Sequence, residues 1–202
     1  ADATGPLFGI MDQPYIGERF AGGFGVAEVV GPLGTSPLAA RQRRAFQDAT
    51  IMTTFPEVGT SLEGRAFRRV AEGVKLTRYG MDCYGYALLA AGQVDLVIEA
   101  GLQPYDIHAP ICLVEAAGGV VSNWQGGAAH LGGRVIAAAN RDIHTVALQI
   151  LQDVVEQFLK ELTSFLDLLP LKFSEKSVAT ISPIFSILQL NSEQLCNVIT
   201  RL

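Results

Sequence analysis

Residues 78–119 read RYGMDCYGYALLAAGQVDLVIEAGLQPYDIHAPICLVEAAGG, and the rest of the chain is interpreted around them. The apolar run Val94–Ile98 has the length and composition of a buried strand. Helical stretches lie on both sides of it, at Met81–Ala91 and Asp106–Ala117. Gly118-Gly119 then suits a left-handed cap at the end of the second helix. This alternation predicts an α/β domain.

The same alternation extends from the first residues to about residue 145. Ser61–Glu72 predicts another helix. Further apolar runs separated by glycine turns predict strands at Leu7–Met11, Gly25–Val30, Ala49–Met52, Gly119–Val121 and Val135–Ala138. Gly31–Pro37, which is rich in Gly, Pro, Thr and Ser, predicts a surface loop. The arginines that follow, Arg41, Arg43 and Arg44, predict a solvated basic face, with an anion site as the alternative.

The composition changes sharply after Gly133, because all 21 glycines lie at or before it. From Val146 onward, apolar residues recur at steps of three and four, which predicts a helix that ends at Pro170. These apolar residues are Leu151, Val154, Val155, Phe158, Leu162, Phe165, Leu166 and Leu169. Ser174 and Asn191 suit the starts of two further helices. We therefore expect an α/β domain at residues 1–145 followed by an all-α tail at 146–202.

Composition and charge exclude several classes of protein. The chain has 202 residues, of which 49% are hydrophobic and 17% charged, and a formal net charge of -5. An acidic chain has no cationic surplus for a phosphate backbone, so we expect no nucleic-acid partner. Three cysteines without Cys-x-x-Cys spacing predict neither a zinc site nor a disulfide framework.

The chain also lacks recognisable targeting features. No apolar run approaches the roughly 20 residues of a membrane span, and no export signal is visible, so we expect a cytoplasmic protein without a span. The sequence opens at Ala1 and almost at once reaches the strand-like segment Pro6–Met11, which we interpret as a cut end.

Three carboxylates near the central strand could bind a ligand. Asp106 follows a strand and turn and opens a helix, where it could bind a hard cation or act as a plain N-cap. Glu99 ends the strand, and could point into the crevice where α/β proteins bind ligands or lie on the surface. Asp82 opens the preceding helix and presents the same choice between a cap and a ligand contact.

The histidines and Cys83 are predicted to have structural or surface roles. The histidines at 108, 130 and 144 are too scattered for a metal set, and each is predicted to be a surface or loop residue. Cys83 is predicted to be a buried structural thiol.

A set of short motifs accompanies the acids. The most specific is Glu99, Gly101 and Tyr105-Asp106, followed by a helix that ends in Glu115–Gly119. Others lie at Gly9–Pro14, Gly17–Phe20, Thr53-Thr54, Trp124–Gly126 and Ala138–Arg141. Together they resemble the inositol monophosphatase superfamily, and within it the histidinol-phosphate phosphatase branch. The resemblance covers about residues 5–145 and implies the C-terminal half of a layered α/β sandwich.

The resemblance implies a Mg²⁺-dependent phosphomonoesterase, in which metal ions position and activate a water for attack on a small phosphate monoester. It implies that Asp106 is a metal ligand and that Glu99 and Asp82 contact hydroxyl or amine groups of the substrate. Arg78, just before the Asp82 helix, is a further candidate for a substrate contact. The positive amine of histidinol phosphate suits these acidic contacts.

The chain also departs from the family pattern. The family's other metal ligands, an early Glu and an Asp-Pro-(Ile/Leu)-Asp-Gly-Thr motif, have no counterpart in this sequence. One carboxylate cannot hold two metal ions, so we expect very weak catalysis by this chain alone, and self-association or a complementing chain. Pro110 is predicted to fall in the first turn of the Asp106 helix.

The tail has a resemblance of its own. Phe158–Lys160, Phe165-Leu166, Ile181–Ile184 and Ile187–Glu193 are similar to parts of the GRIP domain of golgins. That resemblance implies a helical dimer that binds an Arf-like GTPase, although Phe158 stands where the family has tyrosine. The alternative is a generic amphipathic helical hairpin that dimerises or covers apolar surface.

Overall fold

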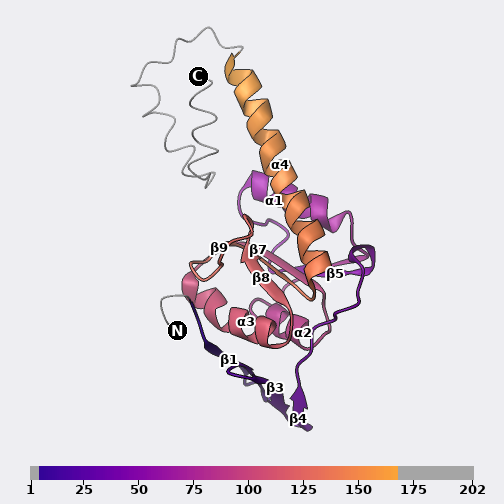
Figure 1. Ribbon diagram of the computed structural model, residues 1–202, viewed down its shortest axis with the longest axis vertical. Helices are drawn as coiled ribbons and strands as arrows, with labels where there is room; N and C mark the ends of the chain where they lie inside the picture. Colours follow the sequence, from indigo (N-terminus) through magenta and orange to yellow (C-terminus); the bar gives the residue numbers. More distant parts are fainter. Residues whose placement is uncertain (1–4, 168–202) are drawn as a thin grey trace. The chain divides into compact units, whose positions relative to one another are not determined.

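The computed structural model describes residues 5–167, with side chains described to residue 161. It divides into two units, residues 1–154 and 155–202, and the elements of the first unit form four layers (Figure 1). No helix in residues 5–167 has the length and apolar character needed to cross a bilayer. The predicted end of the long helix at Pro170, the later tail helices and most of the GRIP-like segment lie outside the described residues.

The first layer is an antiparallel sheet of four strands in chain order. The strands are β1 (Phe8–Gln13), β2 (Glu18–Gly23), β3 (Val26–Gly31) and β4 (Gly34–Pro37). The prediction of a loop at Gly31–Pro37 was therefore wrong, because its second half pairs with β3 as an edge strand. Pro37 ends that strand, a position at an edge where a residue without an N–H is tolerated.

The third layer is a mixed five-stranded sheet in the order β6-β5-β7-β9-β8. Its strands are β5 (Thr50–Thr53), β6 (Leu76–Tyr79), β7 (Leu96–Leu102), β8 (Val120–Asn123) and β9 (Gly133–Ala138). The strands β6, β5 and β7 are parallel, whereas β9 runs antiparallel to both β7 and β8. The carboxyl ends of the three parallel strands therefore lie at one edge of the sheet.

Two helices connect the parallel strands over opposite faces of this sheet. Helix α1 (Ser61–Ala71) joins β5 to β6, and helix α2 (Tyr84–Ala90) returns from β6 to β7 on the other face. Parallel strands whose order reverses in this way leave a crevice beyond their carboxyl ends, where α/β proteins bind ligands.

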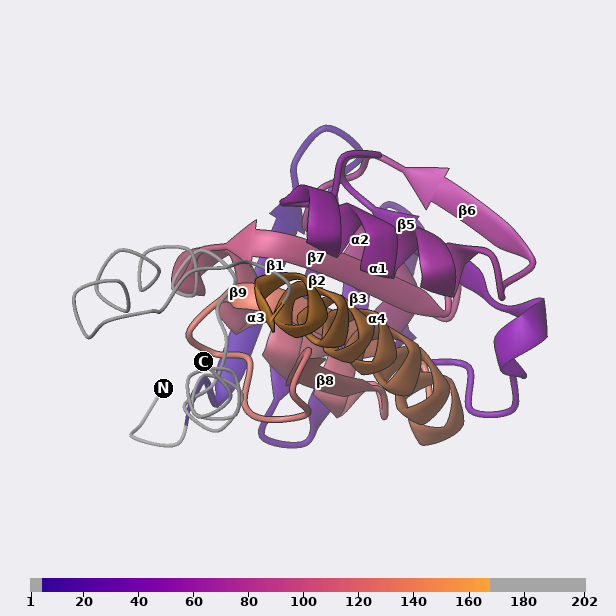
Figure 2. The same cartoon turned by 90° about the horizontal axis from the view of Figure 1, so that it is seen from above.

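The second layer, between the sheets, contains α2 and α3 (Pro104–Ala116). The start of α4 (Arg141–Asp167) lies beside α1 on the far face of the larger sheet (Figure 2). Helix α3 lies very close to the first sheet at two glycines: a Cβ on Gly9 or Gly22 would stand 2.6 Å from a backbone oxygen of the helix. The absence of side chains at these positions sets the spacing of the two layers.

Two helix ends can be compared with the ends that the sequence predicted. Gly118 has a φ of +86°, which confirms the left-handed position predicted after α3. Helix α4 begins at Arg141 rather than Val146, because the Asn140 side chain accepts a hydrogen bond from the Ile143 N–H and caps it earlier. Ala147 and Leu151 of α4 pack in the same core as Ile143.

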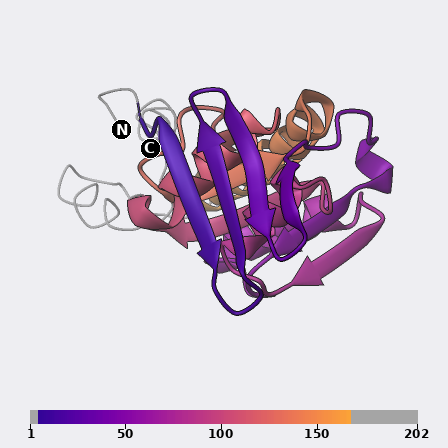
Figure 3. The ribbon, with the colours of Figure 1, turned by 90° about the horizontal axis from the view of Figure 1, so that it is seen from below.

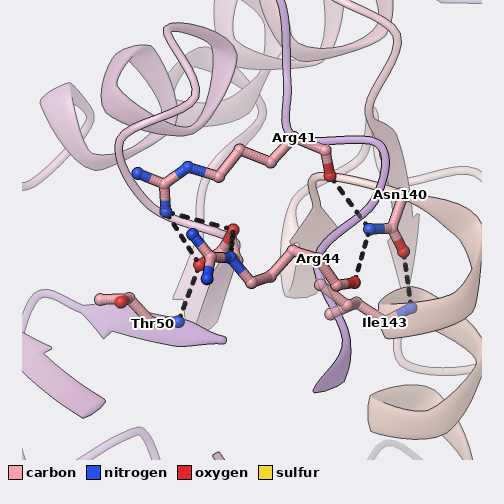
Figure 4. Close-up of polar contacts among 6 residues, drawn as sticks. Arg41, Arg44, Thr50, Asn140 and Ile143 are labelled. Carbon is pink, nitrogen blue, oxygen red and sulfur yellow. Dashed lines mark hydrogen bonds and ion pairs between the residues drawn. The ribbon is translucent and has the colours of Figure 1, made fainter. Parts of the chain in front are cut away.

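The arginine cluster contacts a buried acid instead of forming a solvated face. Asp95, just before β7, is fully buried, accepts a hydrogen bond from the Thr50 N–H at 2.9 Å, and forms ion pairs with Arg41 and Arg44. The Asn140 side chain donates to the carbonyls of both arginines (Figure 4). The solvated-face prediction was wrong for these two arginines, since a buried carboxylate needs a cationic partner.

Candidate functional site

The three predicted acids gather at the carboxyl edge of the parallel strands. We call Asp82, Glu99 and Asp106 the acidic cluster. Glu99 lies on β7, Asp82 precedes α2, and Asp106 lies in the first turn of α3. Asp82 lies within electrostatic range of Glu99, and all three acids lie within electrostatic range of Tyr86 of α2.

Glu99 is held by two threonines. One carboxylate oxygen accepts hydrogen bonds from the Thr54 N–H at 2.7 Å and the Thr54 hydroxyl at 2.8 Å, and the other accepts from the Thr53 hydroxyl at 3.1 Å. Only 8% of the residue is exposed, so the surface interpretation was wrong. Burial raises the pKa of Glu99, the threonine bonds oppose this shift, and the charge of Asp82 adds to it.

Asp82 lies in a left-handed turn. Gly80, Met81 and Asp82 have φ values of +95°, +72° and +48°. A positive φ is unfavourable for the two residues that carry a Cβ, so the surrounding fold must impose it. Helix α2 starts only after Cys83, which is its N-cap, so the prediction of Asp82 as a cap was wrong. The Asp82 carboxylate makes no side-chain hydrogen bond within residues 5–161, and its ligand contact stays a prediction.

Asp106 is not the N-cap of its helix. Gln103 occupies that position, and the Asp106 carboxylate accepts a hydrogen bond from the Gln103 N–H at 2.8 Å as the third residue of a capping box. Asp106 therefore helps to cap its helix, as the N-cap alternative proposed, but from the third helical position instead of the N-cap position. Pro110 lies in the second turn rather than the first, and it has no N–H to donate to the Asp106 carbonyl four residues earlier.

Arg78 is separated from the acids. It is exposed on β6, and its guanidinium donates to the carbonyl of its neighbour Thr77 at 3.2 Å. Among the described side chains, it forms no ion pair with any member of the acidic cluster. The structure thus gathers the three predicted acids and leaves the predicted arginine at the sheet edge.

The predictions for Cys83 and His144 were wrong. Cys83 is exposed, and partial desolvation together with the charge of Asp82 raises the pKa of its thiol. His144 is buried and bonded to the Ser122 hydroxyl at 2.8 Å, and burial lowers its pKa. His144 lies in the first turn of α4, where the sequence predicted a surface or loop residue.

The described residues do not complete a metal site. Within them, no group of three or more His, Cys, Asp or Glu side chains could hold a metal ion. Asp106 offers one carboxylate that is partly exposed. A hard cation such as Mg²⁺ needs more oxygen ligands than this, so the residues present do not by themselves fit the ion.

These features define a layered α/β protein with an acidic cluster at the ends of its parallel strands. Residues 1–156 match the Inositol monophosphatase family. The chain is 38% identical over 156 residues to the bifunctional phosphatase IMPL2, chloroplastic, of Arabidopsis thaliana, which covers 73% of this chain and 44% of the relative. It is 31% identical over 143 residues to an inositol-1-monophosphatase of Mesorhizobium japonicum, covering 69% of this chain and 51% of the relative.

The fold agrees with the sequence matches. An inositol monophosphatase from Zymomonas mobilis superposes with a TM-score of 0.68 at 31% identity, covering 75% of this chain and 60% of that chain. The chain belongs to the inositol monophosphatase family. It spans about half the length of the two curated relatives.

Proposed function

We propose that this chain takes part in the Mg²⁺-dependent hydrolysis of a small phosphate monoester of the histidinol-phosphate type. The observation that carries the proposal is the acidic cluster, which lies where α/β proteins bind ligands and is centred on a carboxylate held by Thr53 and Thr54. Membership of the inositol monophosphatase family supports the reaction class.

The cluster favours a substrate that carries an amine or several hydroxyl groups. Ionised carboxylates only accept hydrogen bonds, so they bind the N–H and O–H groups of a ligand. Glu99 and Asp82 would make these contacts, and Asp106 would supply one ligand to Mg²⁺. Arg78 would contact the phosphate-bearing part of the substrate only after a change in its present orientation.

The remaining metal ligands would come from outside residues 1–202, and a complementing chain is one source. The lack of an Asp-Pro-x-Asp-Gly-Thr motif in residues 1–202 and the incomplete ligand set among the described residues support this proposal. We therefore expect slow turnover by the chain alone. A cytoplasmic location stays a prediction, and the Arabidopsis relative is named as chloroplastic.

Phosphate release from L-histidinol phosphate, with and without Mg²⁺, tests the proposal. We expect slow Mg²⁺-dependent release by the full chain, and loss of that release in Asp106→Ala and Glu99→Gln. Glu72→Gln is the matched control, because Glu72 is an exposed carboxylate just after α1 and is paired with Arg69. If neither the wild type nor any variant releases phosphate, the expectation that the chain alone hydrolyses the substrate is contradicted.

A further inference from the structure

Tyr86 has a buried hydroxyl without a partner. The residue lies in α2 and belongs to the core between the two sheets, with only 2% of its surface exposed. Its hydroxyl oxygen is the buried side-chain polar atom for which no hydrogen-bond partner exists among the described residues. A buried hydroxyl without a partner costs free energy, and native structures rarely tolerate it without a reason.

A neighbouring tyrosine provides the contrast. Tyr84 lies two residues earlier in the same helix, and its hydroxyl donates to the Glu18 carboxylate at 2.6 Å. That bond joins α2 to β2 and gives Tyr84 a clear structural role. Within the described side chains, the hydroxyl of Tyr86 has no such hydrogen bond.

The surroundings of the Tyr86 hydroxyl are acidic. Glu99, Asp106 and Asp82 all lie close enough to act on the phenol, in that order of strength. None of the three forms an ion pair with a lysine or arginine in the part of the chain that the structure describes. The local field is therefore negative, and it attracts a ligand that brings positive charge or N–H and O–H donors.

We propose that the Tyr86 hydroxyl is a substrate-contacting group, whose oxygen accepts a hydrogen bond from the ammonium or hydroxyl group that Glu99 and Asp82 attract. This role rests on the proposed function, and it names the part of the substrate that the site recognises. A phenol oxygen can accept one further hydrogen bond from an ammonium or hydroxyl group that also donates to the two carboxylates. Ligand binding then satisfies the buried hydroxyl.

Two tyrosine variants of the full chain test the role. We expect Tyr86→Phe to leave the melting temperature without ligand unchanged or higher, because it removes an unpaired buried hydroxyl. In isothermal titration with L-histidinol, which lacks the phosphate, the same variant should bind about tenfold more weakly or worse than wild type. Tyr84→Phe should show the opposite pattern, with a lower melting temperature and unchanged affinity.

Three other results would contradict a substrate contact by Tyr86. A fall in the melting temperature of Tyr86→Phe as large as that of Tyr84→Phe would show a structural hydroxyl. Equal affinity of wild type and Tyr86→Phe for L-histidinol would overturn the role while leaving the proposed function intact. No binding of L-histidinol by wild type would overturn the proposed substrate type itself, and the role with it.

Discussion

Glu99 is buried, and its surroundings differ from those of an ordinary surface acid. Its pKa is raised above the usual value of 4.5 mainly because burial disfavours the anion. The native chain therefore holds the Glu99 proton more tightly than the unfolded chain does. By linkage, this residue makes the free energy of unfolding fall as pH rises from near 4.5 through the raised pKa.

Glu99→Gln should remove that dependence, since an amide does not titrate and can still accept the bonds from Thr54. The free energy of unfolding of the variant, relative to wild type, should increase with pH across this window. Urea unfolding at a series of pH values measures the difference, with Glu72→Gln as the control. Parallel curves for wild type and Glu99→Gln would contradict the prediction.

The candidate site was only partly visible in the sequence. Glu99 and Asp106 could be singled out because an acid that follows an apolar run or opens a helix can meet a ligand, although position left a surface role and an N-cap open as well. Glu99 lies within β7 rather than at its end, since the strand continues to Leu102. Tyr86 could not be singled out, because a tyrosine among alanines and leucines has the pattern of a core residue. Its missing hydrogen bond depends on how α2, α3 and β7 pack, which is not a local property.

For helices and strands, the segments with a clear apolar pattern were predicted, among them the edge strands β1 and β8, whereas two short exposed edge strands were missed. The buried strand β7 and the helices α1 and α3 have clear apolar patterns and caps. The strands β4 and β6 lie at sheet edges, have four residues each, and are mostly exposed, so they carry no apolar alternation. β2 was missed as well, because it ends in Gly22 and Gly23.

The contact between β2 and α3 gives a test of packing. In Gly22→Ala, the new Cβ would meet the Cys112 carbonyl oxygen at 2.6 Å, and backbone on both sides would have to move. We expect a loss of about 1–3 kcal/mol in the free energy of unfolding, as for overpacked cores. Chemical denaturation measures it.

Gly31→Ala is the matched control for Gly22→Ala. It lies in the same sheet, and its nearest neighbour would be a flexible Glu18 carbon at 3.4 Å. This variant should be within about 0.5 kcal/mol of wild type or slightly more stable. Equal stabilities of the two alanine variants would contradict the argument that the glycine sets the layer spacing.

At the scale of the whole unit, the outer side of the first sheet has exposed apolar side chains. Figure 3 shows this side of β1–β4, over which no other described element lies. Phe8, Ile10 and Val30 of the strands and Phe24 of the β2–β3 turn are each at least 41% exposed, and Phe8 stacks on Phe24. The exposed Asp12–Arg19 ion pair lies on the same strands. Exposed apolar side chains on a sheet face indicate an interaction surface.

We expect the chain to self-associate through this face in the absence of a complementing chain. A phenylalanine or isoleucine contributes about 1.5–3 kcal/mol when fully buried, so Phe8→Thr with Ile10→Thr should weaken association at least about tenfold. Sedimentation velocity over a concentration series measures it. Leu131→Thr, at an exposed loop residue elsewhere, should change nothing; a wild type that stays monomeric would contradict the expectation.

The contacts of Asn140 restrict how the first unit can move. Its amide NH₂ donates to the carbonyls of Arg41 and Arg44, in the connection between the two sheets, while its oxygen caps the start of α4. A hinge needs a connection whose backbone angles are free to change. Here Asn140 ties that connection to the start of α4, so we expect little change of backbone angle at residues 41–44 and little swinging of one sheet against the other.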